Sequence, residues 1–220
     1  MEPTSRKYLF FDLDGTLTDS MPGIARAVQY ALRRFGIDVQ DLAALKPFLG
    51  PPLRDSFMEF YGMSPEEADR AVAVSREYFV PRGMFENELY PGIPELLAAT
   101  AAAGRVNVIA TSKPQPFAER IVAHFGIDRH FRLISGSTFD GRRKTKADVI
   151  RHALSALGIA PGEAVMIGDR RHDVEGAAEE GLPAIAVEWG YAPPGELEAA
   201  RPLRIVPDVE TLRRLLLGNE

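Results

Sequence analysis

Cysteine is absent from this chain of 220 residues. Its absence excludes disulfide bonds, thiolate metal sites and cysteine nucleophiles. Long apolar runs are missing as well, since no stretch approaches the roughly 20 residues that a bilayer-spanning helix needs. Only a few polar residues separate Met1 from the first apolar run, so we expect no signal peptide. These absences predict a cytoplasmic location and no membrane partner.

Positive charge is also in deficit, because the formal net charge is −5. A nucleic-acid-binding protein carries a basic face, so we predict no nucleic-acid partner. The length fits one sizeable domain, or a core with a smaller insert. An acidic protein that binds an anionic ligand must gather its cations locally. The candidate cations are Lys113, Lys146, the run from Arg142 to Lys144, and Arg170 with Arg171.

Short apolar runs alternate with amphipathic helical patterns through most of the chain. The runs expected to form strands are Tyr8–Phe11, Val106–Ala110, Phe131–Ile134, Ala164–Ile167, Ala184–Val187 and Leu203–Val206. Strands that alternate with helices predict an α/β fold, with a parallel sheet covered on both faces.

The span from about Met21 to Glu88 departs from this alternation. It shows several helical patterns and no convincing strand. Ser64-Pro65-Glu66-Glu67 combines an N-cap, a proline at the first helical position and a capping-box glutamate. We therefore predict a helical insert at residues 19–89, within a core formed by residues 1–18 and 90–220.

Two carboxylates follow the first apolar run, one residue apart. Because side chains alternate along a strand, Asp12 and Asp14 begin on the same face. Both can lean over the carboxyl end of the strand, where open α/β sheets place their chemistry. Such a pair favours a bound cation or a shared proton. By itself it fits N-capping of a following helix equally well.

The string Asp12-x-Asp14-Gly15-Thr16 resembles the first motif of the haloacid-dehalogenase-like hydrolases. Three further stretches resemble the other motifs of that family, in the same order: residues 108–113, Lys146 at the start of a helix, and residues 165–173. The resemblance covers nearly the whole chain. It implies a Rossmann-like parallel-sheet core and a small all-helical cap inserted after the first motif, as in the phosphoglycolate-phosphatase-like branch.

The resemblance also implies a division of roles between the two acids. Asp12 would attack phosphorus and form an aspartyl-phosphate, which splits one difficult displacement into two easier ones. Asp14 would protonate the leaving alcohol and then activate water. Haloacid dehalogenases proper lack this second acid, so Asp14 indicates phosphate chemistry.

Mg²⁺ is the implied cofactor. Its ligands would be the Asp12 carboxylate, the Asp14 backbone carbonyl and the Asp169 carboxylate, because this ion prefers oxygen. Asp173 has three interpretations: a direct ligand, a cap of the helix that begins nearby, or a hydrogen-bonding partner of the groups around the ion, which we favour.

The phosphate-binding groups implied by the resemblance are the Thr111 hydroxyl and the N–H groups of Ser112 and Lys113, which precede a helix. Lys146 would neutralise charge during transfer. Lys144 competes for that role, but Lys146-Ala147-Asp148-Val149-Ile150 matches the helix of the family better. The Lys113 side chain is a further candidate cation near the leaving group.

The predicted cap contains a loop, from Leu49 to Arg54, that resembles a loop used for substrate choice in the phosphoglycolate-phosphatase-like branch. Gly50 allows a turn there, and Arg54 either contacts substrate or lies on the surface of a helix.

The predicted function is Mg²⁺-dependent hydrolysis of a small phosphomonoester, similar to that of a phosphoglycolate phosphatase. The alternatives are a 5'-nucleotidase or pyrophosphatase of the same family, a phosphomutase, and a non-catalytic sensor of a phosphorylated metabolite. The sequence does not indicate which metabolite is bound, nor the oligomeric state.

Overall fold

The computed structural model describes residues 6–218, which form two compact units. The first unit combines the chain up to Thr18 with the chain from Leu89 onward, and the second spans Asp19–Glu88. The sequence analysis expected boundaries at residues 18/19 and 89/90. The first coincides with this division, and the second lies one residue after it.

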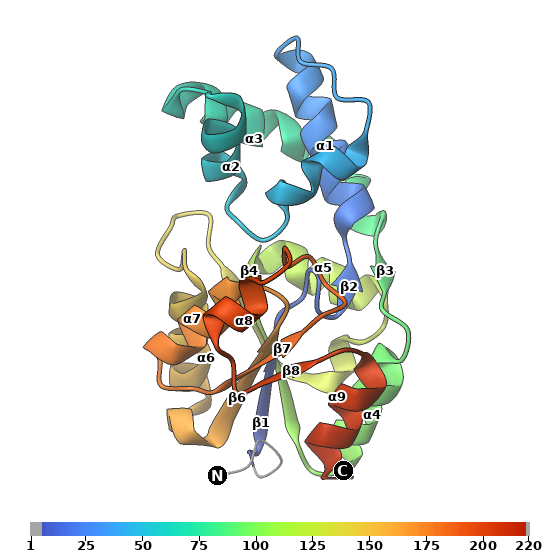
Figure 1. Cartoon of the computed structure of the whole chain (residues 1–220), viewed down its shortest axis with the longest axis vertical. Coiled ribbons are helices and arrows are strands. Elements are labelled where there is room, and N and C mark those ends of the chain that lie inside the picture. Colours follow the sequence, from blue (N-terminus) through green and yellow to red (C-terminus); the bar gives the residue numbers. More distant parts are fainter. Residues whose placement is uncertain (1–5, 219–220) are drawn as a thin grey trace. The chain divides into compact units, whose positions relative to one another are not determined.

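A six-stranded parallel sheet forms the first unit, in the order β5-β4-β1-β6-β7-β8 (Figure 1). The strands are β1 (Tyr8–Phe11), β4 (Val106–Pro114), β5 (Phe131–Ser137), β6 (Ala164–Gly168), β7 (Ala184–Val187) and β8 (Arg204–Val206). The predicted α/β fold class with a parallel-sheet core is confirmed. β4 and β5 extend further than predicted, because backbone pairing continues from Thr111↔Gly136 to Pro114↔Ser137 after the apolar residues end.

β1 occupies the centre of this sheet. It pairs with β4 on one side and with β6 on the other, so that Phe11 lies level with both Ile109 and Ile167. The chain passes from β1 to β4 and β5, then crosses back to β6 and continues to β7 and β8. Sheets of this kind bind ligands where the strand order reverses, outside the carboxyl ends of the strands. Here that position is the end of β1.

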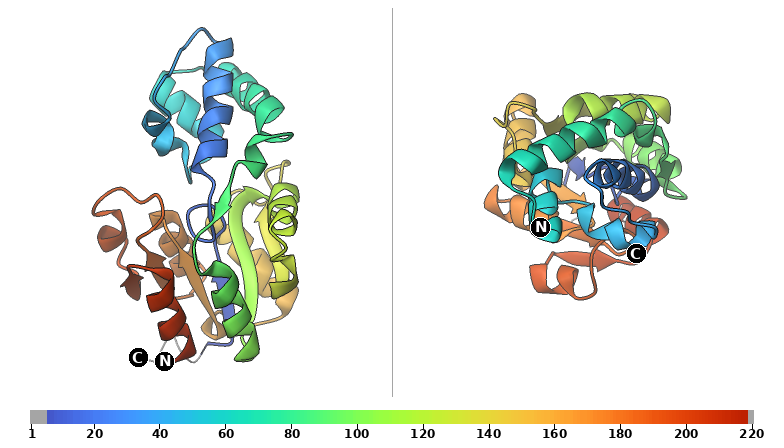
Figure 2. Two further views of the ribbon diagram at one scale, coloured as in Figure 1. Left: turned by 90° about the vertical axis from the view of Figure 1, so that its right-hand side faces the viewer. Right: turned by 90° about the horizontal axis from the view of Figure 1, so that it is seen from above.

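Helices cover both faces of the sheet. Phe10 on one face is buried with residues of α6 (Lys146–Leu157) and α7 (Arg171–Glu179). On the other face Asn107 donates to the Leu97 carbonyl and accepts from Thr100 Oγ1, which fixes α4 (Ile93–Ala102). α9 (Val209–Leu217) lies beside α4 (Figures 1 and 2). The remaining helices of this unit are α5 (Gln115–His124), α8 (Glu196–Ala200) and the 3₁₀ helices η4 (Asp128–His130) and η5 (Pro161–Glu163).

The second unit is helical, as the sequence predicts. Its elements are α1 (Met21–Arg34), η2 (Leu42–Phe48), α2 (Leu53–Tyr61), α3 (Pro65–Phe79) and η3 (Gly83–Phe85). Ser64 and Glu67 form the expected capping box: the Glu67 N–H donates to Ser64 Oγ, and the Ser64 N–H donates to the Glu67 carboxylate. A separate apolar core, which includes Leu32, Phe48 and Phe57, is fully or almost fully buried.

The two connections between the units form a small sheet of their own. It consists of β2 (Thr18–Asp19) and β3 (Glu88–Leu89), strands too short to leave an apolar pattern in the sequence. Within residues 6–218, no helix combines the length and the apolar character that crossing a membrane requires.

Candidate active site

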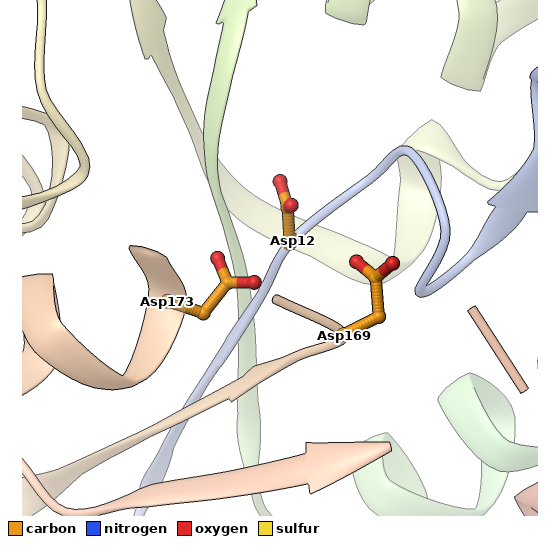
Figure 3. Close-up of side chains that lie close together, drawn as sticks. All are labelled: Asp12, Asp169 and Asp173. Carbon is orange, nitrogen blue, oxygen red and sulfur yellow. The ribbon is translucent and has the colours of Figure 1, made fainter. Parts of the chain in front are cut away.

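Three buried carboxylates meet at the carboxyl edge of the central strands (Figure 3). Asp12 directly follows β1, where its N–H donates to the Ile167 carbonyl at 2.9 Å and prolongs the pairing with β6. Asp169 directly follows β6, and Asp173 lies in the first turn of α7. One oxygen from each carboxylate lies within 4.8 Å of the others. The sheet topology thus brings Asp12 together with two acids that lie more than 150 residues after it in the sequence.

Glycines enclose this carboxylate cluster. A Cβ on Gly15, whose φ is +84°, would lie 2.2 Å from Asp169 Oδ2. A Cβ on Gly190 would lie 2.3 Å from the Asp169 Cβ, and one on Gly168 would lie 2.2 Å from the Asp173 Cγ. Real Cβ contacts are not that short, so backbone rather than side chain must surround these carboxylates.

Lys146 joins two of the three acids. Its Nζ lies 2.9 Å from Asp12 Oδ1 and 2.7 Å from Asp173 Oδ1, and donates to the Ala110 carbonyl at 3.1 Å. The side chain is only 4% exposed. A capping box between Thr145 and Asp148 starts α6 at Lys146, as predicted. Lys144, the competing candidate, is exposed.

Burial and mutual repulsion shift the protonation equilibria of these groups. Burial raises the pKa of Asp12 to about 6, although the Lys146 ammonium and the Thr111 hydroxyl oppose the rise. Burial and the charges of Asp173 and Asp12 raise the pKa of Asp169 well above its ordinary value. Burial lowers the pKa of Lys146, but Asp12 and Asp173 raise it by more, so this lysine remains charged.

The composition of the cluster suits a hard divalent cation. Every candidate ligand is a carboxylate oxygen, which is the donor type that Mg²⁺ prefers. When all three carboxylates are ionised, one ammonium, in contact with Asp12 and Asp173, leaves an excess of about two negative charges in a buried region. A bound divalent cation would offset that excess and lower the raised pKa values of the acids.

Asp173 is the acid for which three interpretations were open. Its Oδ2 accepts from the Arg170 N–H at 3.0 Å, so it caps α7, and its Oδ1 contacts Lys146. Capping is therefore observed, together with direct positioning of the lysine. The same carboxylate also lies within the cluster that could hold a metal.

Asp169 accepts a hydrogen bond from the loop after β7, which the sequence analysis did not assign to the site. Its Oδ2 accepts from the Tyr191 N–H at 2.7 Å, and its Oδ1 accepts from Thr16 Oγ1 at 3.3 Å. Trp189 Nε1 donates to the Thr16 carbonyl at 3.1 Å, which links the two segments. The available signal was Gly190, a small residue between two aromatic ones shortly after β7.

The groups predicted to bind phosphate lie on β4. Thr111 is buried beside Asp12, but its Oγ1 accepts from the Lys113 N–H at 3.2 Å. β4 continues through Ser112 and Lys113 to Pro114, and α5 begins only at Gln115. The two N–H groups thus belong to a strand rather than to the first turn of a helix, and that of Lys113 is occupied by Thr111. Binding of phosphate by the Ser112 and Lys113 N–H groups stays a prediction.

Asp14 and Lys113 form a second charged pair beside the cluster. Lys113 Nζ donates to Asp14 Oδ2 at 2.6 Å, and the two side chains are 5% and 17% exposed. Asp14 Oδ1 is buried and has no hydrogen-bond partner among the described residues.

Gly50 and Arg54 belong to the helical unit and are not members of the cluster. Gly50 has a φ of +103°, which fits the predicted turn. Arg54 Nε donates to Asp69 Oδ1 at 2.7 Å, so the guanidinium links α2 to α3 while its side chain remains 43% exposed.

Residues 9–187 match the model of a family described as haloacid dehalogenase-like hydrolases. The chain belongs to this family. The family resemblance expected from the sequence is therefore confirmed.

Relatives of this hydrolase include a 5'-nucleotidase of Pseudomonas aeruginosa, which is 47% identical over 94% of each chain. A tyrosine-protein kinase, PtkA of Mycobacterium tuberculosis, is 42% identical over 85% of this chain, which spans 64% of the length of PtkA. A crystal structure of a predicted phosphatase from Clostridium acetobutylicum superposes with a TM-score of 0.93, at 46% identity over 97% and 99% of the two chains.

Phosphoglycolate phosphatases are more distant from this hydrolase. That of Yersinia pestis is 32% identical over 82% of this chain and 80% of its own length. The predicted family and enzyme class, a hydrolase of phosphoric monoesters, are confirmed. Of these named relatives, the 5'-nucleotidase is thus more similar to this chain than the phosphoglycolate phosphatase, the type that the sequence analysis placed first.

Proposed function

We propose that this hydrolase is a Mg²⁺-dependent phosphatase of a small phosphorylated metabolite, and that it acts through an aspartyl-phosphate on Asp12. One observation carries the proposal: Asp12, Asp169 and Lys146 converge at the carboxyl edge of β1 and β6, with Thr111 beside Asp12. Asp14 supplies a second carboxylate two residues beyond the nucleophile, paired with its own lysine.

The residues divide the chemistry into two displacements. An Asp12 oxygen forms a bond to phosphorus while the ester P–O bond breaks, and its electron pair leaves with the alcohol oxygen, which takes a proton from Asp14. Asp14 then removes a proton from water, which attacks phosphorus and releases Asp12 and inorganic phosphate. Lys146 offsets negative charge on Asp12 and on the transferring group, and the Thr111 hydroxyl donates to a phosphate oxygen.

Mg²⁺ would be held by the Asp12 and Asp169 carboxylates and the Asp14 backbone carbonyl. When bound, it supplies positive charge that draws the phosphate to Asp12 and offsets charge during transfer. Asp173 serves this arrangement by fixing Lys146 and capping α7, rather than as a required ligand.

The Asp19–Glu88 unit is proposed to act as a cap that admits substrate and excludes water. Its connections, β2 and β3, would then be the hinges. Gly50 and Arg54 are proposed to influence which metabolite is accepted, since contacts away from the reacting phosphate supply binding rather than chemistry.

Nucleoside 5'-monophosphates are the first substrates to test, because a 5'-nucleotidase is 47% identical over almost the whole chain. Phosphoglycolate follows, since the named phosphoglycolate phosphatases are more distant. Pyrophosphate is the third candidate. A cytoplasmic location, with neither nucleic-acid nor membrane partners, completes the proposal and derives from composition alone.

Phosphate release from these substrates, measured with and without Mg²⁺, tests the proposal. We expect turnover that requires the metal and is abolished in Asp12→Asn, which removes the attacking oxygen's charge. Binding of a monophosphate without release of phosphate would indicate a sensor, and isomerisation without net release would indicate a phosphomutase. Full activity of Asp12→Asn, or full activity in excess chelator, would refute the mechanism.

A further inference from the structure

The two oxygens of the Asp14 carboxylate have different surroundings. Lys113 Nζ lies 2.6 Å from Asp14 Oδ2, and both residues belong to the first unit. The other oxygen, Oδ1, is buried without a hydrogen-bond partner among the described residues. A buried carboxylate oxygen without a hydrogen-bond partner destabilises the fold unless a substrate or water atom binds to it.

We propose that Lys113 is a positioning residue for Asp14: it holds Oδ2 and so reserves Oδ1 for the proton exchanged with the leaving group and with water. This inference rests on the proposed phosphatase mechanism, and it assigns the Lys113 side chain, which the sequence analysis gave as a candidate cation near the leaving group, to Asp14. The ammonium keeps its protons throughout. The proton that moves is carried on Oδ1, passes to the alcohol oxygen as the P–O bond breaks, and is replaced from the attacking water.

The backbone on both sides of the pair is fixed, which is what a positioning role requires. The Lys113 N–H donates to Thr111 Oγ1 within the extended part of β4. Asp14 lies in a tight turn, where the Gly15 N–H donates to the Thr18 carbonyl at 2.8 Å. With both ends held, a single short contact is sufficient to set the rotation of the Asp14 carboxyl group.

The arrangement of the cations also favours this role over phosphate binding. Lys146 already lies beside the nucleophile, where the transferring group would be, and contacts Asp12 and Asp173. Lys113 contacts the second acid instead, with a side chain that is 5% exposed. The two lysines are thus assigned to the two carboxylates, one for the attack and one for the proton.

Leaving-group dependence tests the assignment. The alcohol that departs from an alkyl phosphate, here a nucleoside 5'-monophosphate, needs protonation as it leaves, whereas p-nitrophenyl phosphate releases p-nitrophenolate, which is a stable anion. Lys113→Met should lower kcat on the alkyl ester by about 10²-fold, the scale of a misplaced catalytic group. It should lower kcat on the aryl ester far less. Lys113→Arg should restore much of the alkyl activity, and Lys144→Met, a change at an exposed lysine, should match the wild type.

Asp14→Asn separates failure of this inference from failure of the proposed function. We expect that variant to show the same preference for the aryl ester, and Lys113→Met to cost nothing further when added to it, because the lysine acts only through Asp14. Lys113→Gln, with retained melting temperature as the check on folding, replaces Lys113→Met if the latter does not fold.

Three outcomes would overturn the inference. Equal losses on both esters in Lys113→Met would make Lys113 a phosphate-binding cation, and wild-type rates on both would leave it without a catalytic role. Additional loss when Lys113→Met is combined with Asp14→Asn would show that the lysine acts independently of the acid. If Asp14→Asn itself shows no leaving-group preference, the acid–base role of Asp14 is refuted, and the inference about Lys113 is refuted with it.

Discussion

Gly176 lies where α7 packs directly against the start of α6, and replacing it by alanine tests how tightly Lys146 is held. A Cβ at this position would lie 2.7 Å from the Lys146 Cβ and 2.9 Å from the Ala147 backbone nitrogen. Ordinary contact begins at 3.4 Å, so the first turn of α6 must retreat by the difference, about 0.7 Å. The obstacle includes backbone, so rotation of a side chain cannot relieve the overlap.

Two opposing terms set the stability of Gly176→Ala. Alanine is favoured over glycine in a helix interior by about 1 kcal/mol. Overpacking at a buried contact costs about 1–3 kcal/mol. We therefore expect the free energy of unfolding to fall by about 0–2 kcal/mol, rather than to rise as it would at an open helical position.

The larger effect of Gly176→Ala should be on turnover. Lys146 contacts Asp173 at 2.7 Å and Asp12 at 2.9 Å, and displacement of its backbone strains both contacts. Misplacement of this order can lower a rate by up to about 10²-fold, so we expect kcat for phosphate release to fall by at least about tenfold.

Thermal melting and phosphate release, measured on the same preparation, distinguish these expectations. Gly162→Ala is the matched control, because a Cβ at Gly162 meets no heavy atom within 4 Å. If Gly176→Ala were more stable by about 1 kcal/mol with unchanged kcat, the contact between α7 and α6 would not constrain the lysine, and the reasoning would be refuted.

Three further expectations concern the metal, the start of α6 and the helical unit. Mg²⁺ should raise the melting temperature of the wild type but not of Asp169→Asn, because a ligand that binds the native state stabilises it by mass action. If Mg²⁺ left the wild-type melting temperature unchanged, the proposed metal site would be contradicted. N–H groups of Thr145 and Lys144 lower the pKa of Asp148 from 3.8 to about 2, so its stabilising effect is complete above pH 4 and is lost as the pH falls through 2. Asp148→Asn should thus lower the free energy of unfolding at pH 7 by about 1 kcal/mol, with the difference from the wild type closing near pH 2 in acid titrations followed by circular dichroism. Arg54→Ala should raise KM for the metabolite and leave p-nitrophenyl phosphate turnover unchanged, whereas equal losses on both would point to phosphate binding.

Much of the acidic cluster could be predicted because each residue stands at the boundary of an element. Asp12 and Asp169 directly follow apolar strands, and Lys146 opens a helix whose apolar face is clear in the sequence. Since parallel strands end at one edge, residues at such boundaries meet wherever the strands are neighbours. The sequence patterns do not indicate which strands are neighbours, so it was the family resemblance that assigned Asp12 and Asp169 to one site.

Contacts made by long side chains or by irregular backbone could not be predicted in this way. The reach of Lys113 Nζ to Asp14 depends on the spacing of β4 and the loop after β1. The Tyr191 N–H binds Asp169 through a loop conformation that carries no periodic signal. The extension of β4 through Lys113 likewise follows from pairing with β5, since its own residues there are polar.

The central place of β1 has a consequence for the order in which the protein can fold during synthesis. β1 pairs Tyr8 with Val106 and with Ala164, so both of its neighbours are translated long after it. Contacts between such distant segments form slowly because a long loop must close first. The helices of Asp19–Glu88, in contrast, contact one another within a short stretch that is complete before β4 exists. The nascent chain therefore carries Asp14 and Asp12 without their lysine partners until residues 113 and 146 have been translated.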